Sequence, residues 1–494
     1  MLAKITRVNC QEFNDLFVEE ISLEDVSIEE DTIKFVYSIE DEPIPCSIRY
    51  DTVDFTAPIF KYPERTLSFA VVIAAICSIR FGALLPKRLN FKRYSRYIDK
   101  ELLEFLKFVM YKHWSQHRYQ VGQISYHGPE FAVTDSELGK DAHYPLWSAA
   151  KSDRKAEVLL ASGSGKDSLL CSRILEAAGV KYDIATGFHD IYGDHESQEK
   201  WFDQVMSYLK AGARHGVYFQ DEYYLWLENR LNKTNIPNRT RDYFGRGRFR
   251  PEAGEALMFN IAMIPIQILH GIPILAGGDE KSADAPNLKE PESGELVTHE
   301  WLKSFTFHQT IFKLRGRMFE GINSTSLLKP IHDIRIFQLL FELDSKLPYA
   351  TNSCNLQKPW CCRCEKCCYV FAGFCAYGDV DKTIQAFKNN LFDMEENLPY
   401  WEELLGLKGY IPFECIGLPE EAQWYFYKLY LKGIKGLAME LFVEKVLNPL
   451  KAKGEHHVEE YFSEIEQRFS QVYENHHTMP EWLWQKIRPV LTCK

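Results

Sequence analysis

The sequence predicts an α/β fold built on a parallel sheet, with an α+β region before it and a mainly helical region after it. Short apolar runs at 156–161, 181–187 and 272–278 are separated by stretches of helical periodicity, as parallel strands and their covering helices are. Before these runs, the first 60 residues alternate apolar and polar positions, which indicates a small sheet. Beyond Asp379 the spacing is mainly helical. We therefore expect an N-terminal α+β domain at 1–150, an α/β domain at 151–350, a cysteine-rich module at 351–380 and a helical region at 381–494.

Composition and charge limit the classes of function. The chain has 494 residues, of which 46% are hydrophobic and 26% charged, which is typical of a folded protein with several structural units. The formal net charge of −11 gives no general basic face, so nucleic acid is not expected as the main partner. A small molecule is the expected partner, and the sequence does not indicate an oligomeric state.

The sequence also suggests a compartment. The most apolar run, Leu67 to Ile79, is shorter than the ~20 residues that a bilayer-spanning helix needs, so we expect a buried helix and no membrane partner. The N-terminal residues MLAKITRVNCQEF lack the apolar core of a signal peptide. Six of the 13 cysteines lie between Cys354 and Cys368, a clustering that points to metal or thiol chemistry rather than disulfides. These features predict a cytoplasmic protein.

A glycine- and serine-rich turn follows the first strand of the predicted parallel sheet. Its small residues let the backbone approach an anion, and the N–H groups that open the next helix point at that anion. The turn is not a Walker A loop, because Leu160 stands in place of the first glycine and Asp167 follows the lysine. Nor is it a dinucleotide fingerprint, since Ser168 replaces the third glycine. A plain strand-to-helix connection is the alternative to a phosphate site formed by Gly163, Ser164, Gly165, Lys166, Asp167 and Ser168.

This turn resembles the PP-loop of the ATP pyrophosphatase superfamily, usually written S-G-G-x-D-S. The resemblance implies that ATP, with Mg²⁺, is cleaved between its α- and β-phosphates, typically to adenylate a substrate. Gly165, Asp167 and Ser168 match directly, whereas Gly163-Ser164 replaces the usual Ser-Gly. His189 and Asp190 follow the second predicted strand and are candidates for contact with the nucleotide or the magnesium ion.

The cysteine cluster has the spacing of a metal site. Cys354, Cys361, Cys364 and Cys367 form a C-x6-C-x2-C-x2-C pattern that can wrap four thiolates around one tetrahedral zinc ion. Four thiolates leave no open position, so the predicted zinc is structural. Cys362 and Cys368 lie next to these ligands and are interpreted as spare thiols; reduced cysteines packed in a core without metal are the alternative. Similar zinc modules occur in PP-loop enzymes such as 7-cyano-7-deazaguanine synthase.

Further polar segments follow the predicted buried strand at 272–278, where such groups line a site. They read G-G-D-E-K-S-A-D at 277–284 and H-E-W-L-K-S-F-T-F at 299–307, and later W-C-C-R-C-E-K-C-C-Y-V-F at 360–371 and P-F-E-C-I-G at 412–417. Their order, with the K-D-S turn, resembles the ATP-dependent UDP-N-acetyl-α-D-muramoyl-L-alanyl-L-glutamate epimerase family. The resemblance runs from about Tyr62 to about Tyr430, and Cys362 stands where the family pattern has glycine.

The resemblance implies that the terminal L-glutamate of a UDP-linked muramoyl dipeptide is inverted to D-glutamate through an acyl-adenylate, with release of AMP and pyrophosphate, in peptidoglycan precursor synthesis. An acyl-adenylate lacks the carboxylate charge that suppresses ionisation of the neighbouring C–H. Removing and returning that proton requires acid and base groups within hydrogen-bond reach. Our candidates for substrate and proton handling are Asp279, Glu280, His299, Lys303 and Cys415.

Four residues are candidates for substrate binding. Arg246 and Arg248 could clamp the UDP diphosphate through bidentate hydrogen bonds, with a solvated basic loop as the alternative, and Lys281 and Ser282 lie in the polar segment at 277–284.

Two other functions stay open. The zinc module is also consistent with a PP-loop ligase or amidating enzyme related to 7-cyano-7-deazaguanine synthase, which leaves 413–415 unexplained. A non-catalytic nucleotide-sensing protein is the third interpretation, against which the retained Lys166-Asp167-Ser168 turn argues.

Overall fold

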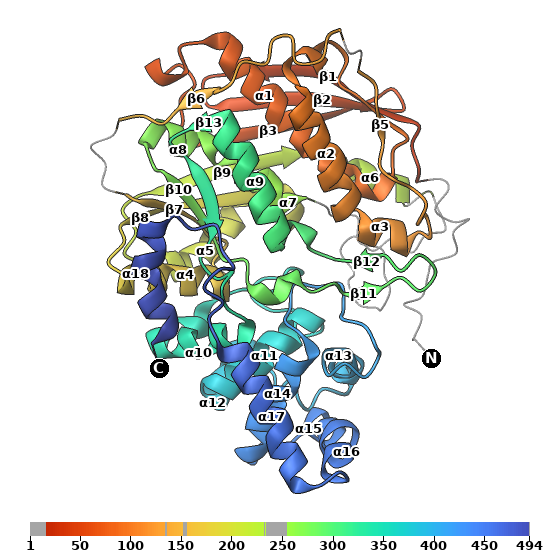
Figure 1. Cartoon of the computed structure of the whole chain (residues 1–494), viewed down its shortest axis with the longest axis vertical. Coiled ribbons are helices and arrows are strands. Elements are labelled where there is room, and N and C mark those ends of the chain that lie inside the picture. The colour runs from red at the N-terminus through yellow and green to blue at the C-terminus, as the bar shows by residue number, and fades with distance from the viewer. Residues whose placement is uncertain (1–15, 134–135, 152–155, 232, 234–253, 494) are drawn as a thin grey trace.

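One ten-stranded sheet organises the first two thirds of the chain, and a bundle of helices lies below it in Figure 1. The strand order is β14-β10-β7-β8-β9-β3-β2-β1-β4-β5. Two small two-stranded sheets, β11–β12 and β13–β6, accompany it. The computed structural model describes residues 16–133, 136–151, 156–231, 233 and 254–493.

Half of the sheet is parallel, as the strand–helix alternation predicts. β7 lies in the middle of this half, with β8 on one side and β10 on the other, and Val158 pairs with both Tyr182 and Ile274. After β7 the chain first forms β8 on one side of it and later forms β10 on the other side. The point where the strand order reverses in this way is where open α/β sheets bind ligands. The strands are β7 (Val158–Ala161), β8 (Tyr182–His189), β9 (Arg214–Asp221), β10 (Ile274–Gly277) and β14 (Asn323–Ser326).

The other half carries the N-terminal strands. β1, β2 and β3 form an antiparallel meander in which buried and exposed positions largely alternate, and β3 pairs with β9 in antiparallel orientation. The predicted N-terminal sheet is thus continuous with the parallel sheet, and the domain boundaries at 150 and 350 stay a prediction. The strands are β1 (Glu20–Ile28), β2 (Thr32–Ile39), β3 (Glu42–Tyr50), β4 (Arg88–Asn90) and β5 (Glu130–Phe131); the smaller sheets contain β6 (Trp147–Ser148), β11 (Leu288–Lys289), β12 (Leu296–Val297) and β13 (Phe319–Glu320).

The sheet separates two apolar cores, and helices cover both of its faces. Leu159 packs into the core that contains the N-terminal region, whereas Val158 and Leu160 pack into the core that continues into the C-terminal helices. This division follows from the alternation of side chains along a strand. The helices of this part are α1 (Pro63–Cys77), α2 (Lys100–His113), α3 (Ser115–Gln120), α4 (Lys166–Ala177), α5 (His195–Met206), α6 (Tyr223–Leu231), α7 (Glu255–Ala262), α8 (Ile264–His270), α9 (Phe305–Met318) and α10 (Asp333–Leu343).

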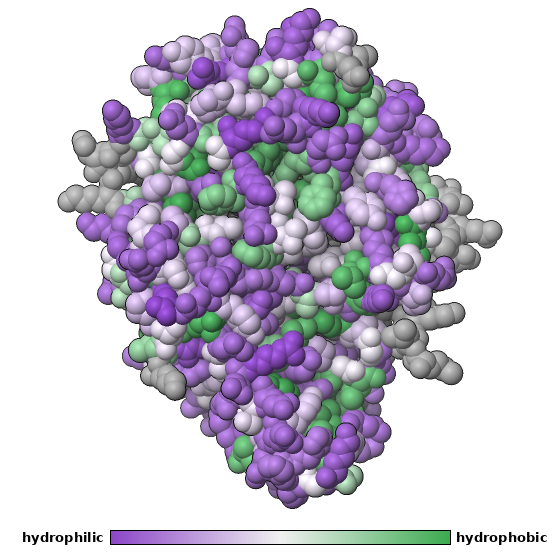
Figure 2. Space-filling model, in the orientation of Figure 1, coloured by the Kyte–Doolittle hydropathy of each residue, from purple (hydrophilic) through white to green (hydrophobic). Residues whose placement is uncertain are grey.

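The most apolar helix is a core helix. Within the described residues, Pro63–Leu84 alone is long and apolar enough to cross a membrane, but 94% of its most apolar window is buried in the fold. Burial in the core accounts for this apolarity, because a helix in the core of a folded protein can be as apolar as one that spans a membrane. The face drawn in Figure 2 agrees: apolar side chains form small separate patches on a mainly hydrophilic surface.

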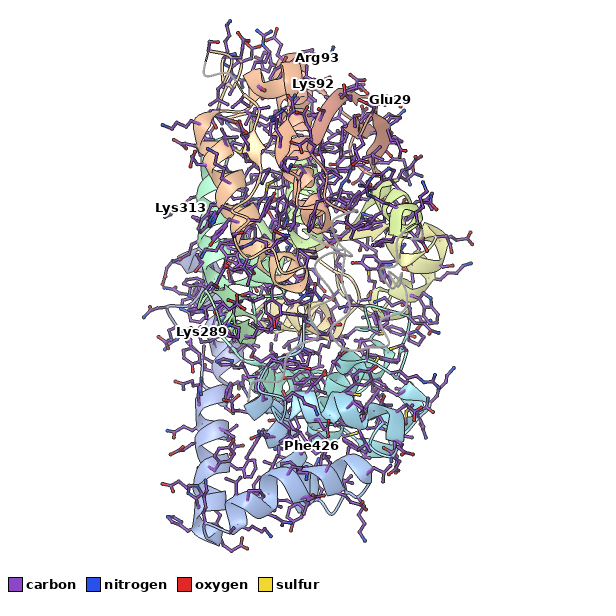
Figure 3. The ribbon with its side chains drawn as sticks, turned by 90° about the vertical axis from the view of Figure 1, so that its right-hand side faces the viewer. Glu29, Lys92, Arg93, Lys289, Lys313 and Phe426 are labelled. Carbon is purple, nitrogen blue, oxygen red and sulfur yellow. The ribbon has the colours of Figure 1, made fainter. Side chains whose placement is uncertain are left out.

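The C-terminal region is helical, as predicted, and returns to the sheet at its end. Phe426 lies in this lower part of the molecule, far from Lys92 and Arg93 at the opposite end (Figure 3). α18 packs beside α4, and Lys486 forms an ion pair with Glu157 at 2.8 Å. The helices are α11 (Glu365–Tyr377), α12 (Val380–Phe387), α13 (Leu398–Leu404), α14 (Pro419–Leu431), α15 (Leu437–Phe442), α16 (Asn448–Lys451), α17 (Glu455–Ser470) and α18 (Glu481–Thr492).

Candidate active site

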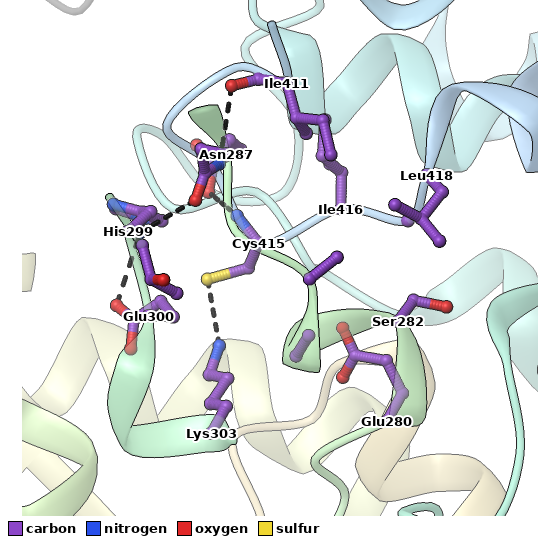
Figure 4. Close-up of a pocket in the computed structure, with 15 residues that line it drawn as sticks. Glu280, Ser282, Asn287, His299, Glu300, Lys303, Ile411, Cys415, Ile416 and Leu418 are labelled. Carbon is purple, nitrogen blue, oxygen red and sulfur yellow. Dashed lines mark hydrogen bonds and ion pairs between the residues drawn. The ribbon is translucent and has the colours of Figure 1, made fainter. Parts of the chain in front are cut away.

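The polar segments at 277–284, 299–307 and 412–417 meet around one narrow cavity (Figure 4). Four of the five candidate catalytic residues, Glu280, His299, Lys303 and Cys415, line it, as does Ser282. The cavity volume is about 30 Å³, which is enough for reacting atoms but not for a whole nucleotide sugar. The remaining lining residues are Ala283, Ala285, Asn287, Thr298, Glu300, Ile411, Glu414, Ile416, Gly417 and Leu418.

Local structure explains how these residues reach the cavity. Glu280 follows β10, whose carboxyl end can approach α4 closely because Gly278 has no side chain: a Cβ there would lie 3.1 Å from the Cβ of Asp167. Lys303 ends a 3-10 turn directly before α9, whose N-cap Ser304 accepts a hydrogen bond from Phe307 N. Cys415 lies in the loop between α13 and α14. The cavity is therefore fixed by one strand end, one helix start and one loop.

Lys303 and Cys415 form a pair in the wall of the cavity. Lys303 Nζ donates a hydrogen bond to Cys415 Sγ at 2.9 Å. Burial raises the pKa of the Cys415 thiol to about 11, although Lys303 acts to lower it. Burial alone would lower the pKa of Lys303, but Cys415 and the carboxylates of Glu300 and Glu280 raise it well above its usual value. At neutral pH the pair is therefore a thiol beside an ammonium ion.

Glu280 belongs to a group of buried acids. Burial raises its pKa to about 7, the carboxylates of Asp333 and Asp167 act in the same direction, and Lys303 and Lys166 oppose the shift. Glu280 therefore takes up and releases its proton much nearer neutral pH than an ordinary glutamate does, which suits a group that handles a proton. In Figure 4 its carboxylate lies on the side of Ser282 and Leu418, whereas the Cys415 sulfur points toward Lys303.

His299 is held from two sides. Its backbone N–H donates to Asn287 Oδ1 at 2.8 Å, and its ring Nδ1 lies 2.6 Å from Gln116 Oε1. Donor atoms of His299, Glu300 and Cys415 lie within 4.8 Å of one another, so these three residues could also hold a metal ion. The Lys303 ammonium group already occupies the neighbourhood of the Cys415 sulfur, which favours proton handling over metal binding at this position.

Two other candidates from the same segment do not line the cavity. Asp279 Oδ2 pairs with His308 Nε2 at 3.0 Å. Burial alone would raise the pKa of Asp279, but the hydrogen bond from His308 and the positive charges of His308, Lys303 and Lys329 together lower it. Lys281 lies with its Nζ 4.4 Å from the centre of the Tyr473 ring. Ser282 lines the cavity, and its Oγ lies 2.8 Å from His332 Nδ1.

The turn at 163–168 lies at the carboxyl end of β7, as predicted. Gly163 faces open space, and Ser164 adopts a left-handed conformation with φ of 55°. Lys166 points inward: its Nζ bonds to Asp167 Oδ1 at 2.6 Å and to the buried Asp333 Oδ1 at 2.7 Å. Its backbone N–H donates to Ser353 Oγ at 3.0 Å, so the segment before the cysteine cluster covers the start of α4. The Lys166 charge therefore offsets the buried Asp333 and the half-buried Asp167 beside the turn.

A larger cavity adjoins the end of β8. Its volume is about 560 Å³, and its wall contains Asp190, Asp221, Tyr224, Trp201 and Asn355 among other residues. His189 is buried behind it, with Nδ1 3.0 Å from Asp190 Oδ1. The cavity has the size of a small-molecule site, since such sites span roughly 300–1,000 Å³. Arg246 and Arg248, the candidates for diphosphate binding, lie outside the described residues.

The four predicted cysteine ligands lie together. Their sulfur atoms are within 4.8 Å of one another, and Cys361 Sγ is 3.7 Å from Cys367 Sγ. Four sulfurs around one zinc ion at about 2.3 Å would be about 3.8 Å apart, so the donor set fits this metal. Backbone N–H groups of Leu356, Arg363 and Cys367 each point at a cluster sulfur at 3.4 Å. Cys362 is not in the cluster and lies 3.2 Å from Phe387 O.

The cysteine cluster also supports the narrow cavity. Asn355 Nδ2, one residue after Cys354, donates to Glu414 Oε1 at 2.8 Å, and the same oxygen accepts from Cys415 N at 2.8 Å. Lys366, between two cluster cysteines, donates to the Cys415 carbonyl oxygen. The cluster is thus connected by hydrogen bonds to the loop that presents Cys415.

Comparisons with known proteins find relatives of part of this chain. Residues 341–457, which contain the four cysteines and Cys415, match the family model of the MurL C-terminal domain. This segment is MurL-like. A UDP-N-acetyl-α-D-muramoyl-L-alanyl-L-glutamate epimerase of Micromonospora sp. is 27% identical over 174 residues, which cover 33% of the chain and 38% of that relative. The enzymes of the same name from Salinispora tropica and Xanthomonas oryzae pv. oryzae are 28% and 22% identical, over 33% and 54% of the chain and 37% and 56% of their own lengths.

These matches cover part of the molecule. The chain spans less than two fifths of the length of the first two relatives. No solved structure matches the chain significantly. The MurL-like segment contains Cys415 and the cysteine cluster, whereas Glu280, His299 and Lys303 lie before it. The narrow cavity therefore combines a recognisable segment with residues that only the fold brings to it.

Several cavity residues were not predicted from the sequence. Glu300, Glu414 and Asn287 lie within or beside the quoted motifs, so proximity to those motifs could have suggested them. Gln116 lies in the N-terminal region, far along the chain from His299, and no spacing pattern links the two residues.

Proposed function

We propose that the protein epimerises the terminal L-glutamate of UDP-N-acetylmuramoyl-L-alanyl-L-glutamate, in a reaction that consumes ATP. The observation that carries the proposal is the narrow cavity, in which Glu280 meets the Lys303–Cys415 pair beside a MurL-like segment. An epimerase must remove a proton from one face of a carbon atom and return one to the other face. The cavity offers one group suited to each task.

ATP would activate the substrate for proton removal. Attack of the glutamate α-carboxylate on the α-phosphate of ATP forms an acyl-adenylate and releases pyrophosphate. The acyl-adenylate has no carboxylate charge, so the neighbouring Cα–H ionises more readily to an enolate. The turn at 163–168, at the switch point of the sheet, and the 560 Å³ cavity beside Asp190 support nucleotide binding here. When bound, Mg²⁺ would offset phosphate charge near Asp167 and Asp190.

Glu280 is the proposed base. Its pKa of about 7 means that a carboxylate is available at neutral pH and that its protonated form is also accessible. Burial among Asp333 and Asp167 increases the basicity of this carboxylate, because a second and third negative charge nearby favour uptake of a proton. Glu280 would take the Cα proton of the acyl-adenylate.

Cys415 is the proposed acid on the other face. Its thiol is protonated at neutral pH, and Lys303 at 2.9 Å would stabilise the thiolate that remains after the proton moves to Cα. Hydrolysis of the inverted acyl-adenylate then releases AMP and the D-glutamyl product. Overall, the L-substrate, ATP and water give the D-product, AMP and pyrophosphate, so all groups balance.

Zinc has a structural place in this proposal. The four sulfurs fit a zinc ion, and when bound it would hold the loop of Cys354 and the start of α11 together. Asn355 and Lys366 would then keep Glu414 and Cys415 in position. Zinc takes part in no chemical step.

Two alternative functions make different demands on the site and on the products. A PP-loop ligase or amidating enzyme would also use the turn and the cysteine cluster, but it has no need of a buried thiol–ammonium pair opposite a carboxylate. A non-catalytic nucleotide-sensing protein would bind ATP without forming AMP. Product analysis separates all three.

Isotope exchange tests the assignment of base and acid. The Cys415→Ala and Glu280→Gln variants would each be incubated with ATP, Mg²⁺ and either the L- or the D-glutamyl substrate in deuterated water. Cys415→Ala retains Glu280 and should exchange the Cα proton of the L-stereoisomer alone. Glu280→Gln retains only Cys415, which can take up a proton only as a thiolate, so it should exchange the D-stereoisomer alone, and faster as the pH rises toward the Cys415 pKa of about 11. The same stereoisomer preference in both variants would contradict the assignment.

A further inference from the structure

The helix α3 is unusual because it buries polar side chains. Ser115, Gln116, His117, Arg118, Tyr119 and Gln120 are each between 1% and 7% exposed. Burying polar groups is unfavourable unless they are hydrogen-bonded, so such a helix implies a specific set of partners. Those partners lie in the segment that leads to His299.

α3 holds this segment at several points. Ser115 Oγ accepts a hydrogen bond from Thr298 N at 3.2 Å, directly before His299. Arg118 binds both carboxylate oxygens of Glu295 at 2.5 and 3.0 Å, and the Tyr119 ring packs against Phe413. These contacts fix the backbone around His299, and Gln116 contacts the His299 ring itself.

Gln116 has two hydrogen-bonding ends with different partners. Its Nε2 donates to Gln120 Oε1 at 3.1 Å, which leaves its Oε1 directed at His299 Nδ1 at 2.6 Å. An amide oxygen can only accept, so the imidazole must carry its proton on Nδ1. In a neutral ring the lone pair is then on Nε2.

We propose that Gln116 is a positioning residue that holds His299 in the Nδ1–H tautomer and presents Nε2 to the narrow cavity as a hydrogen-bond acceptor. Nε2 lies 3.9 Å from Glu300 Oε1, and the ring belongs to the small group in which ligand atoms of His299, Glu300 and Cys415 lie within 4.8 Å of one another. A carboxylate oxygen only accepts, so the donor in this group that an acceptor at Nε2 can serve is the Cys415 thiol. The role of this acceptor in turnover rests on the proposed epimerase function. The tautomer itself does not.

The test is nitrogen NMR of the full-length protein labelled with ¹⁵N-histidine, with the His299 signals identified by their loss in His299→Asn. The wild-type ring should show a protonated Nδ1 and an unprotonated Nε2. Gln116→Leu, which removes the acceptor, should lose this pattern and lower kcat about 10- to 100-fold with little change in KM. Gln116→Glu keeps an acceptor and should restore both the tautomer and most of kcat.

Ser115→Ala is the matched control, because it removes a contact between α3 and the same segment but leaves the ring of His299 untouched. It should keep the wild-type ring signals. A wild-type ring protonated on Nε2, or ring signals unchanged in a folded Gln116→Leu protein, would overturn the inference. Because the NMR signals need no turnover, a failure of the proposed substrate would leave this result intact.

Discussion

The cysteine cluster and the narrow cavity are assembled in opposite ways. All four cysteines lie between Cys354 and Cys367, so one short segment contains the complete donor set. The walls of the cavity come from residues 280–303 and 411–418, with α3 of the N-terminal region behind His299. A site built from one segment can be identified by spacing, whereas a site built from several needs the fold. Substitutions in the cluster should mainly lower stability, whereas substitutions in the cavity should mainly lower the rate of turnover.

The largest expected effect is on rate. Lys303→Met removes the ammonium group that faces Cys415 Sγ at 2.9 Å and would stabilise its thiolate, so turnover should fall by about 10²- to 10⁴-fold. The measurement is formation of D-glutamyl product by chiral analysis. Lys313→Met is the control, because Lys313 lies on the exposed surface of α9 (Figure 3) and should leave turnover unchanged. A Lys303→Met protein with more than a tenth of wild-type turnover would show that this ammonium group is not needed.

The cysteine cluster should show its effect in metal content and stability. Cys364→Ser removes one of four ligands, so zinc per chain should fall from about one to near zero, and the free energy of unfolding by about 4 kcal/mol or more. Elemental analysis and urea unfolding measure the two quantities. Cys362→Ser, a change two residues away but outside the cluster, should retain the metal. Equal zinc content in the two variants would argue against the cluster as the binding site.

Lys166 tests whether the turn is stabilised from within. Lys166→Met breaks its pairs with Asp167 and Asp333 and leaves the buried Asp333 carboxylate uncompensated, so unfolding free energy should fall by roughly 3–5 kcal/mol. Lys486→Met removes an ion pair of similar length, 2.8 Å, whose lysine is 41% exposed, and should change stability by less than about 1 kcal/mol. Equal effects in urea unfolding would mean that Lys166 serves the ligand rather than the fold.

A smaller effect concerns pH. The pKa of Glu280 is about 7 in the folded protein, above its ordinary value of 4.5, so between these pH values the folded state holds a proton that the unfolded state releases. The stability linked to this proton is complete below pH 4.5 and is lost as pH rises toward 7. Glu280→Gln, which stays neutral, should therefore gain stability relative to wild type between pH 5 and pH 8, by about 1–3 kcal/mol.

Thermal unfolding of wild type and Glu280→Gln at pH 5 and at pH 8 measures this difference. Glu196 is exposed and gives the control, because Glu196→Gln should change stability by the same amount at both pH values. A Glu280→Gln protein that follows the wild-type pH dependence would place the pKa of Glu280 near its usual value and remove the reason for assigning it as the base.

Much of the fold follows from local pattern. The strand–turn–helix unit at 158–177, the later buried strand and the C-terminal helices occur where periodicity predicts them, because each is decided by neighbours in the chain. The pairing of β3 with β9 could not be predicted, since it joins residues 46–50 to residues 217–221 without any local signal. That pairing makes the sheet continuous.

The site shows the same division. Glu280, His299, Lys303 and Cys415 were selected from their motifs and share one cavity, but their roles stay predictions. The motifs did not reveal that Asp279 pairs with His308 or that Lys166 pairs with Asp333. The direction of these side chains depends on α9 and α10, which lie further along the sequence. Gln116 is the extreme case, with its signal present only in three dimensions.

The most direct test of the account is one incubation of the zinc-loaded protein with ATP, Mg²⁺ and UDP-N-acetylmuramoyl-L-alanyl-L-glutamate in deuterated water. Chiral analysis of the glutamate and detection of AMP give the result. The account predicts D-glutamate with deuterium at Cα, formed together with AMP and pyrophosphate. Recovery of L-glutamate without deuterium, from folded protein that retains its zinc, would contradict it.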